Sequence, residues 1–257
     1  MKENFAIIVP IYKELDCLER LSLDRLFEIN KIGNHKIIFL KNNNLKDYVT
    51  EYEDFVYETI LVDEKHFKDT SSYSYYIESV DFWKLFLDKF EYIYIYQTDC
   101  FLLKDNLQEW VDKNFDFIGA PIISTNANWN NVPCTGNGGF SLRKVKKFYK
   151  LAEFAKNHEN EISSKFKHYE DLYFLQYVGK KIYIDLPNFK DAALFCWDMN
   201  PDVLDANKFD IPMCVHAWPK NIPFWRTKIK EMDKEIIVNT AYSKYKNFID
   251  VYYLKKK

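Results

Sequence analysis

The chain of 257 residues has little glycine, and half of what it has lies in one short segment. Only six glycines are present, and three of them fall within Gly136–Gly139. Glycine concentrated in one place indicates either positive φ angles or a close approach to the backbone there. A ligand or a neighbouring strand is able to make that approach, so the segment is a candidate site. A tight structural corner is the alternative.

Cysteine pairs and long apolar runs are also missing. The five cysteines are odd in number and include no Cys-x-x-Cys pair. They are Cys17, Cys100, Cys134, Cys196 and Cys214. This pattern fits neither a disulfide framework nor a zinc site, and it predicts reduced thiols in a cytoplasmic protein. The apolar run Phe5–Val9 is too short for a signal peptide, and no run is long enough to span a bilayer.

The charge of the chain is close to balanced. The net charge of −2 gives no overall basic field that would attract nucleic acid, so we expect no nucleic-acid partner. The segment Lys255–Lys257 is predicted to be a solvated end, with weak attraction to an anionic membrane surface as the alternative. Hydrophobic residues make up 47% of the chain, which is ample for a packed core in one large domain.

Apolar runs typical of buried strands alternate with segments of helical spacing. The predicted strands are Phe5–Val9, Lys36–Leu40, Val56–Val62, Tyr92–Tyr96 and Asp116–Ala120. The predicted helices are Leu15–Asn30, Tyr76–Leu87, Leu142–Lys156 and a helix that begins after a cap at Asp105. In the first of these, a break with a new cap at Ser22 is the alternative. This alternation predicts an α/β fold with a mainly parallel sheet between two layers of helices.

One predicted strand, Tyr92–Tyr96, is followed closely by a single acid, Asp99. Ligands of open α/β sheets bind at the carboxyl ends of the strands. We therefore predict that Asp99 binds a metal or a sugar. A simple turn residue is the alternative, because aspartate also favours turns.

Two later segments carry further polar candidates. Glu170 and Asp171 are predicted to open a helix that Gly179 ends. Such a pair complements the helix dipole, but a desolvated carboxylate beside another acid also has a raised pKa that suits a general base. His216 lies among apolar residues, where a hydrogen-bonded core histidine is the ordinary explanation. It is a metal candidate if it lies close to Asp99.

Taken in order, six segments resemble a known family. The segments are VPIYKE, IYQTDCFLL, IGAP, GNGGFSLR, EDLYF and HAWPK. Together they resemble a bacterial glycosyltransferase-like family, once called a domain of unknown function and related to the GT-A nucleotide-sugar transferases. The resemblance runs from about Phe5 to Lys220. It implies a single GT-A-like domain with a Rossmann-like sheet, in which residues 1–125 bind nucleotide, 126–226 bind acceptor and metal, and 227–257 form an extension.

The resemblance also implies ligands and residue roles. The implied ligands are a divalent cation, Mn²⁺ or Mg²⁺, and a nucleotide-sugar donor, with a UDP-sugar first. The implied metal ligands are Asp99 and His216. The implied base is Asp171, with Glu170 beside it. Residues implied to bind substrate are Asn137, Gly138, Gly139, Phe140 and Trp218. Residues implied to hold the nucleotide are Pro10, Ile11, Tyr12, Gln97 and Asp99.

The resemblance has one departure, and it leaves other functions open. The usual DxD has two acids, whereas Gln97-Thr98-Asp99 keeps only the last, which weakens metal affinity in principle. The implied activity is inverting sugar transfer to a glycan acceptor in bacterial surface polysaccharide or lipooligosaccharide synthesis, at or near the inner face of the membrane. A non-catalytic glycan- or nucleotide-binding module on the same fold is the alternative. A nucleotidyltransferase ranks lower, because VPIYKELD lacks the usual glycine.

Overall fold

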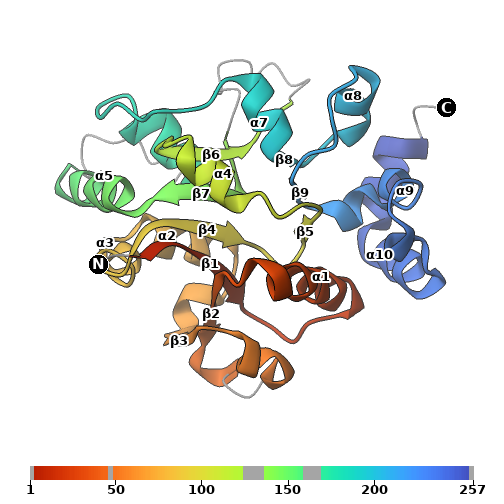
Figure 1. Cartoon of the computed structure of the whole chain (residues 1–257), viewed down its shortest axis with the longest axis horizontal. Helices are drawn as coiled ribbons and strands as arrows, with labels where there is room; N and C mark the ends of the chain where they lie inside the picture. Colours follow the sequence, from red (N-terminus) through yellow and green to blue (C-terminus); the bar gives the residue numbers. More distant parts are fainter. Residues whose placement is uncertain (1–2, 46–48, 124–135, 159–168, 255–257) are drawn as a thin grey trace.

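A six-stranded sheet forms the centre of the molecule in the computed structural model, which describes residues 3–45, 49–123, 136–158 and 169–254 (Figure 1). Its strand order is β3-β2-β1-β4-β7-β6. The strands are β1 (Glu3–Ile11), β2 (Lys36–Asn42), β3 (Glu58–Val62), β4 (Phe90–Tyr96), β6 (Phe117–Ala120) and β7 (Asn137–Lys144). The first four are parallel, and β7 is antiparallel to both β4 and β6. The predicted α/β fold with a mainly parallel sheet is confirmed.

Both faces of the sheet are covered, so successive strand residues enter two different cores. One core includes Ile7 and Val9 and packs against α1 (Cys17–Gly33) and α4 (Leu107–Asp112). The other includes Ala6 and Ile8 and packs against α2, α3 and α5. Their bounds are Thr70–Glu78, Val80–Lys84 and Val145–Asn157. This explains why the predicted strands are apolar at nearly every position.

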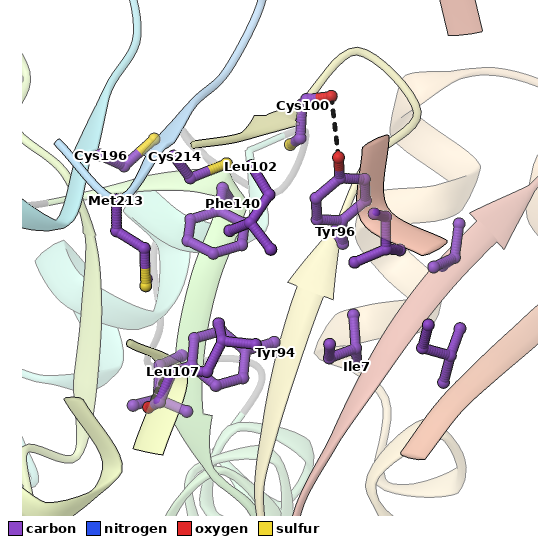
Figure 2. Packing of buried hydrophobic residues seen from close by; sticks show 14 of the residues in the cluster. Ile7, Tyr94, Tyr96, Cys100, Leu102, Leu107, Phe140, Cys196, Met213 and Cys214 are labelled. Atoms are coloured by element: carbon purple, nitrogen blue, oxygen red, sulfur yellow. Dashed lines mark hydrogen bonds between the residues drawn. The ribbon is translucent and has the colours of Figure 1, made fainter. Parts of the chain in front are cut away.

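A small second sheet extends one end of the molecule. It consists of β5 (Phe101–Leu102), β9 (Cys214–Val215) and β8 (Cys196–Trp197), in that order. Figure 2 shows Cys196 and Cys214 of this sheet, and Cys100 just before β5, in the same core as Tyr96 and Phe140. These cysteines are free, in agreement with the prediction, whereas Cys134 lies outside the described residues.

The remaining elements connect these sheets or form the C-terminal region. They are η1 (Asn43–Leu45), η2 (Thr50–Phe55), η3 (Glu64–Phe67), α6 (Glu170–Leu172), η6 (Tyr173–Val178), α7 (Phe189–Phe195), α8 (Pro201–Ala206), η7 (Trp218–Asn221), α9 (Ile222–Trp225), η8 (Lys230–Asp233), α10 (Glu235–Ile249) and η9 (Asp250–Leu254). The C-terminal helix α10 lies near α1 and is tied there by the ion pair between Lys244 and Asp16, 2.6 Å apart. Within the described ranges, no helix combines the length and the apolar character that crossing a membrane requires.

Four sequence predictions about helices are wrong in detail. The helix predicted from Tyr76 to Leu87 is two helices, because Ser79 ends α2 and caps the start of α3. The first helix is continuous through Ser22. It starts at Cys17, because Asp16 and Glu19 form a capping box there. The helix predicted from Leu142 begins only at Val145, since the residues before it pair with β4 as part of β7. Asp105 does not cap α4; its carboxylate instead lies 2.7 Å from Nε2 of His35.

Candidate functional site

The predicted site residues come from strands that end or begin at the same edge of the central sheet. The chain leaves β1 at Tyr12 and β4 at Gln97, and the antiparallel strand β7 begins at Asn137. The backbone N–H of Gln97 donates to the carbonyl of Gly139 over 3.0 Å, which joins two of these segments directly. This edge is where ligands of open α/β sheets bind.

Two adjoining cavities lie at this edge. The cavity on the β1 side is about 270 Å³ in volume. Its lining residues are Pro10, Tyr12, Phe67, Lys68, Asp69, Thr70, Tyr73, Gln97, Thr98 and Asp99. The cavity on the β7 side is about 120 Å³. Its lining residues are Thr70, Tyr73, Ser74, Gln97, Asn137, Gly138, Gly139, Tyr169, Glu170, Asp171 and His216. Since Thr70, Tyr73 and Gln97 line both, the two cavities share one wall.

His216 and Asp99 meet where the two cavities join. Nε2 of His216 lies 3.2 Å from Oδ1 of Asp99 and 3.2 Å from Oε1 of Gln97. Burial alone would raise the pKa of Asp99, but the imidazole of His216 holds that pKa below its usual value. Burial alone would lower the pKa of His216, but the carboxylates of Asp99 and Asp198 raise it well above its usual value.

Asp198 is a member of the site that the sequence analysis missed. It follows β8 directly and is 9% exposed. Its Oδ1 lies 3.2 Å from Nδ1 of His216, but the two atoms are not aligned for a hydrogen bond. Its other oxygen accepts a 2.7 Å hydrogen bond from Nδ2 of Asn137. The available signal was a short apolar run ending on an acid, the same pattern that identifies Asp99, but β8 is only two residues long.

The donor atoms around Asp99 and His216 fit a divalent cation. Two ligand atoms in adjacent positions of an octahedral ion with bonds of about 2.1 Å are about 3 Å apart, close to the 3.2 Å between Oδ1 and Nε2. Carboxylate and amide oxygens suit Mg²⁺ and Mn²⁺, and an imidazole favours Mn²⁺ between these two. Sγ of Cys100 completes a group of three ligand atoms within 4.8 Å of one another. Burial raises the pKa of that thiol, which donates to the carbonyl of Gly139, so Cys100 is not the favoured ligand.

The glycine cluster allows close approach rather than unusual backbone angles. All six glycines lie in the described ranges, and none has a positive φ. A Cβ on Gly139 would lie 2.2 Å from Nε2 of His216. A Cβ on Gly138 would lie 2.6 Å from Nη2 of Arg143 and 2.6 Å from Oε1 of Glu170. The expectation of close approach is therefore confirmed, and the approaching groups are side chains of the site.

Asp171 lines the β7-side cavity together with His216. Its Oδ2 accepts from the backbone N–H of Gly138 over 2.8 Å, and its Oδ1 accepts from the N–H of Leu172 over 2.7 Å. Burial and the neighbouring charge of Glu170 raise the pKa of Asp171 to about 7. A carboxyl group with that pKa is able to exchange a proton near neutral pH.

Glu170 has a different role from its neighbour. Its Oε1 lies 2.7 Å from Nη2 of Arg143, a fully buried side chain on β7. The same guanidinium lies near the rings of Phe117 and Phe148 and also donates to the carbonyl of Gly138. Glu170 is therefore engaged in a buried ion pair beneath the glycine segment, while Asp171 faces the cavity.

A protein family model matches residues 56–216, which is more than half of the chain. The chain belongs to that family, described as Protein of unknown function (DUF5672). The match includes every site residue from Gln97 to His216, and the segment Pro10–Tyr12 lies outside it. No curated protein matches the chain.

The fold of this DUF5672 protein is also similar to that of a solved structure. That structure is the crystal structure of a glycosyltransferase involved in the glycosylation of the major capsid of PBCV-1. The TM-score is 0.53 at 10% sequence identity, and the alignment covers 83% of this chain and 92% of the other. At this identity the likeness concerns the fold alone, so the DUF5672 protein has a glycosyltransferase-like fold.

Three predicted binding residues of the DUF5672 protein have side chains in the core. Ile11 and Trp218 are 0% exposed, and Phe140 is 1% exposed. Nε1 of Trp218 donates to Oγ of Ser22, and the ring of Phe140 stacks on Tyr94. These side chains therefore pack behind the site, whereas the sequence resemblance implies a place at the ligand for them.

Proposed function

We propose that this chain is a metal-dependent, inverting glycosyltransferase that moves a sugar from a nucleotide-sugar to a hydroxyl group of a glycan acceptor. The observation that supports it most is the arrangement of Asp99 at one cavity with His216 and Asp171 at the adjoining one, where the imidazole of His216 lies beside Asp99. The glycosyltransferase-like fold agrees with it. The acceptor class, a bacterial surface polysaccharide or lipooligosaccharide, rests on the sequence resemblance.

The β1-side cavity is the candidate donor site. Small-molecule pockets are typically about 300–1,000 Å³, so a cavity of about 270 Å³ with a second one beside it suits a nucleotide whose sugar points toward the shared wall. Tyr12 and Tyr73 offer aromatic surfaces for a base or ribose. Lys68 adds a positive charge for a phosphate. We take UDP-sugars as the first candidates.

Asp99, His216 and Gln97 are the side chains that would hold the cation and the diphosphate. The low pKa of Asp99 keeps its carboxylate charged at neutral pH. Held by these residues, a divalent cation would supply positive charge against the negative charge that grows on the leaving nucleoside diphosphate. The amide of Gln97 supplies a neutral oxygen where the usual motif has a second acid.

Asp171 is the candidate general base. Its carboxylate takes the proton of the acceptor hydroxyl while the acceptor oxygen forms a bond to the anomeric carbon. The bond from that carbon to the diphosphate breaks at the same time, and its electrons leave with the diphosphate. The two backbone N–H groups on Asp171 fix the direction of its carboxylate. Attack from the face opposite the leaving group gives inversion.

Titration calorimetry with uridine diphosphate and Mn²⁺ tests this proposal. We expect the wild-type chain to bind the pair, Asp99→Asn to lose that binding, and Asp171→Asn to retain it. A thermal-shift screen of UDP-, GDP- and CMP-sugars, with and without Mn²⁺, then identifies the donor, because a ligand of the native state raises its melting temperature. Failure to bind any nucleotide in the screen, or unchanged binding by Asp99→Asn, would count against the proposal.

A non-catalytic binding module is a second candidate, and the single acid of Gln97-Thr98-Asp99 favours it. Such a module would bind the donor without turning it over. Slow hydrolysis of the bound donor by the wild-type chain, abolished in Asp171→Asn, rejects the module. Tight donor binding with no hydrolysis and no transfer to any acceptor tested supports it.

A further inference from the structure

We infer that Asp198 is a positioning residue, which orients the imidazole of His216 toward the cation and ties it to the glycine segment of β7. The inference rests on the proposed function for the identity of the cation. Asp198 does not line either cavity, so any effect it has on a bound ion acts through its neighbours.

Strand pairing places Asp198 beside His216. In the parallel pair of β8 and β9, Trp197 is opposite Val215, so the next residues on each strand are Asp198 and His216. The backbone N–H of His216 also donates to the carbonyl of Trp197 over 2.8 Å. Both residues are at most 9% exposed, which limits the number of conformations that their side chains adopt.

The two ring nitrogens of His216 face different groups. Nδ1 faces Asp198, while Nε2 faces Asp99 and Gln97 at the cavities. Histidines that bind metals commonly direct their other ring N–H at a carboxylate, which fixes the tautomer, orients the ring and makes the metal-binding nitrogen more basic. A proton held at Nδ1 by Asp198 leaves the lone pair of Nε2 for the cation.

The second oxygen of Asp198 extends this arrangement to the β7-side cavity. It accepts from Nδ2 of Asn137, and Oδ1 of Asn137 accepts the backbone N–H of Gly139 over 2.9 Å. Gly139 is the residue whose missing Cβ makes room for the ring of His216. One buried carboxylate therefore holds both the imidazole and the backbone that lies against it.

Asp198→Asn tests the inference sharply, because both neighbours of the carboxylate are donors. Each carboxylate oxygen faces a different neighbour, and an amide has one oxygen and one NH₂ group, so in the same position the variant presents an acceptor to only one of His216 and Asn137. Removing an outer-shell partner of a metal site typically costs about 10–100-fold in metal affinity. We expect a loss of this size for Mn²⁺, measured by electron paramagnetic resonance with and without uridine diphosphate.

Two controls separate positioning from a general structural effect. Asp105→Asn breaks an aspartate–histidine pair away from the site, with His35 near the amino end of β2, and should leave Mn²⁺ affinity unchanged. In a double-mutant cycle, Asp198→Asn should weaken Mn²⁺ binding no further in a His216→Ala background, because its effect acts through that ring. If Asp198→Asn folds poorly, Asp198→Glu should bind Mn²⁺ more weakly than the wild type while keeping the charge.

The outcomes distinguish this inference from the proposed function. The positioning role is wrong if both Asp198 variants bind Mn²⁺ as tightly as the wild type. It is also wrong if Asp198→Asn lowers Mn²⁺ affinity equally with and without the His216 ring. Either result leaves the proposed function standing. If the wild-type chain binds no Mn²⁺ even with uridine diphosphate, both the metal-dependent function and the positioning role are wrong.

Discussion

The two cavities at the sheet edge each contain a carboxylate, and their surroundings shift its pKa in opposite directions. On the β1 side, the imidazole of His216 keeps the pKa of Asp99 low. On the β7 side, burial and the charge of Glu170 raise the pKa of Asp171 to about 7. Pairs of acids with such divergent environments commonly divide the work of a reaction. The comparison assigns Asp99 to charge stabilisation and Asp171 to proton transfer.

The largest expected effect comes from removing the base alone. We expect Asp171→Asn to lower the turnover number by about 10²–10⁴, because its amide cannot take the acceptor proton. Affinity for uridine diphosphate with Mn²⁺ should stay at the wild-type level, since the carboxylate of Asp171 is bound to the backbone N–H groups of Gly138 and Leu172. Steady-state kinetics with the donor found by thermal shift, together with calorimetry, measure both. Asp191→Asn on α7, whose partner is Lys113, is the matched control and should have full activity.

The next effect concerns the space that glycine leaves for His216. In Gly139→Ala the added methyl group would meet the imidazole, so we expect a loss of about 1–3 kcal/mol in the free energy of unfolding and a weaker affinity for Mn²⁺. Gly136→Ala is the control, because its methyl group would meet the ends of two apolar side chains, Ile122 at 2.9 Å and Leu175 at 3.5 Å, which are able to move. Denaturant unfolding measures the difference. Equal stability of the two variants would contradict the role of Gly139.

A smaller effect tests whether Glu170 acts on Asp171 by charge. Glu170→Gln keeps an acceptor for Arg143 but removes a negative charge, so the pKa of Asp171 should fall. The acid limb of the pH–rate profile should then move to lower pH, because the base is deprotonated over a wider range. An unchanged limb would show that burial alone raises the pKa of Asp171.

The raised pKa of Asp171 also makes stability depend on pH. The folded chain binds this proton more tightly than the unfolded chain, for which the pKa is 3.8. Proton binding by Asp171 therefore stabilises the fold fully below pH 3.8. This stabilisation is lost as pH rises from 3.8 to about 7. Between about pH 5 and pH 8, the melting temperature of Asp171→Asn should thus rise relative to that of the wild type. A constant difference would contradict the assigned pKa.

The sequence predicts the central sheet and the outline of the site because those features are local. The apolar runs that became β1 and β4 are continuous, and Asp99 follows soon after one of them. The glycine segment is conspicuous for a similar reason, since so little glycine occurs elsewhere.

Features that depend on distant segments could not be predicted. Asp198 is recognisable only through its partners Asn137 and His216, which come from other strands. Leu142 has helical spacing with later residues, but pairing with Tyr94 of β4 keeps it in β7. Burial of Trp218 likewise follows from packing around α1, and no local pattern distinguishes a buried tryptophan from one that faces a ligand.

The most direct test of the divided roles is a carboxyl ¹³C NMR titration of the metal-free protein, with signals assigned from Asp99→Asn and Asp171→Asn. The account predicts that Asp171 titrates near pH 7, whereas Asp99 titrates below 3.8. If both carboxyl groups titrate together near their ordinary value, the two acids are equivalent and the assignment of a charged ligand and a base is contradicted.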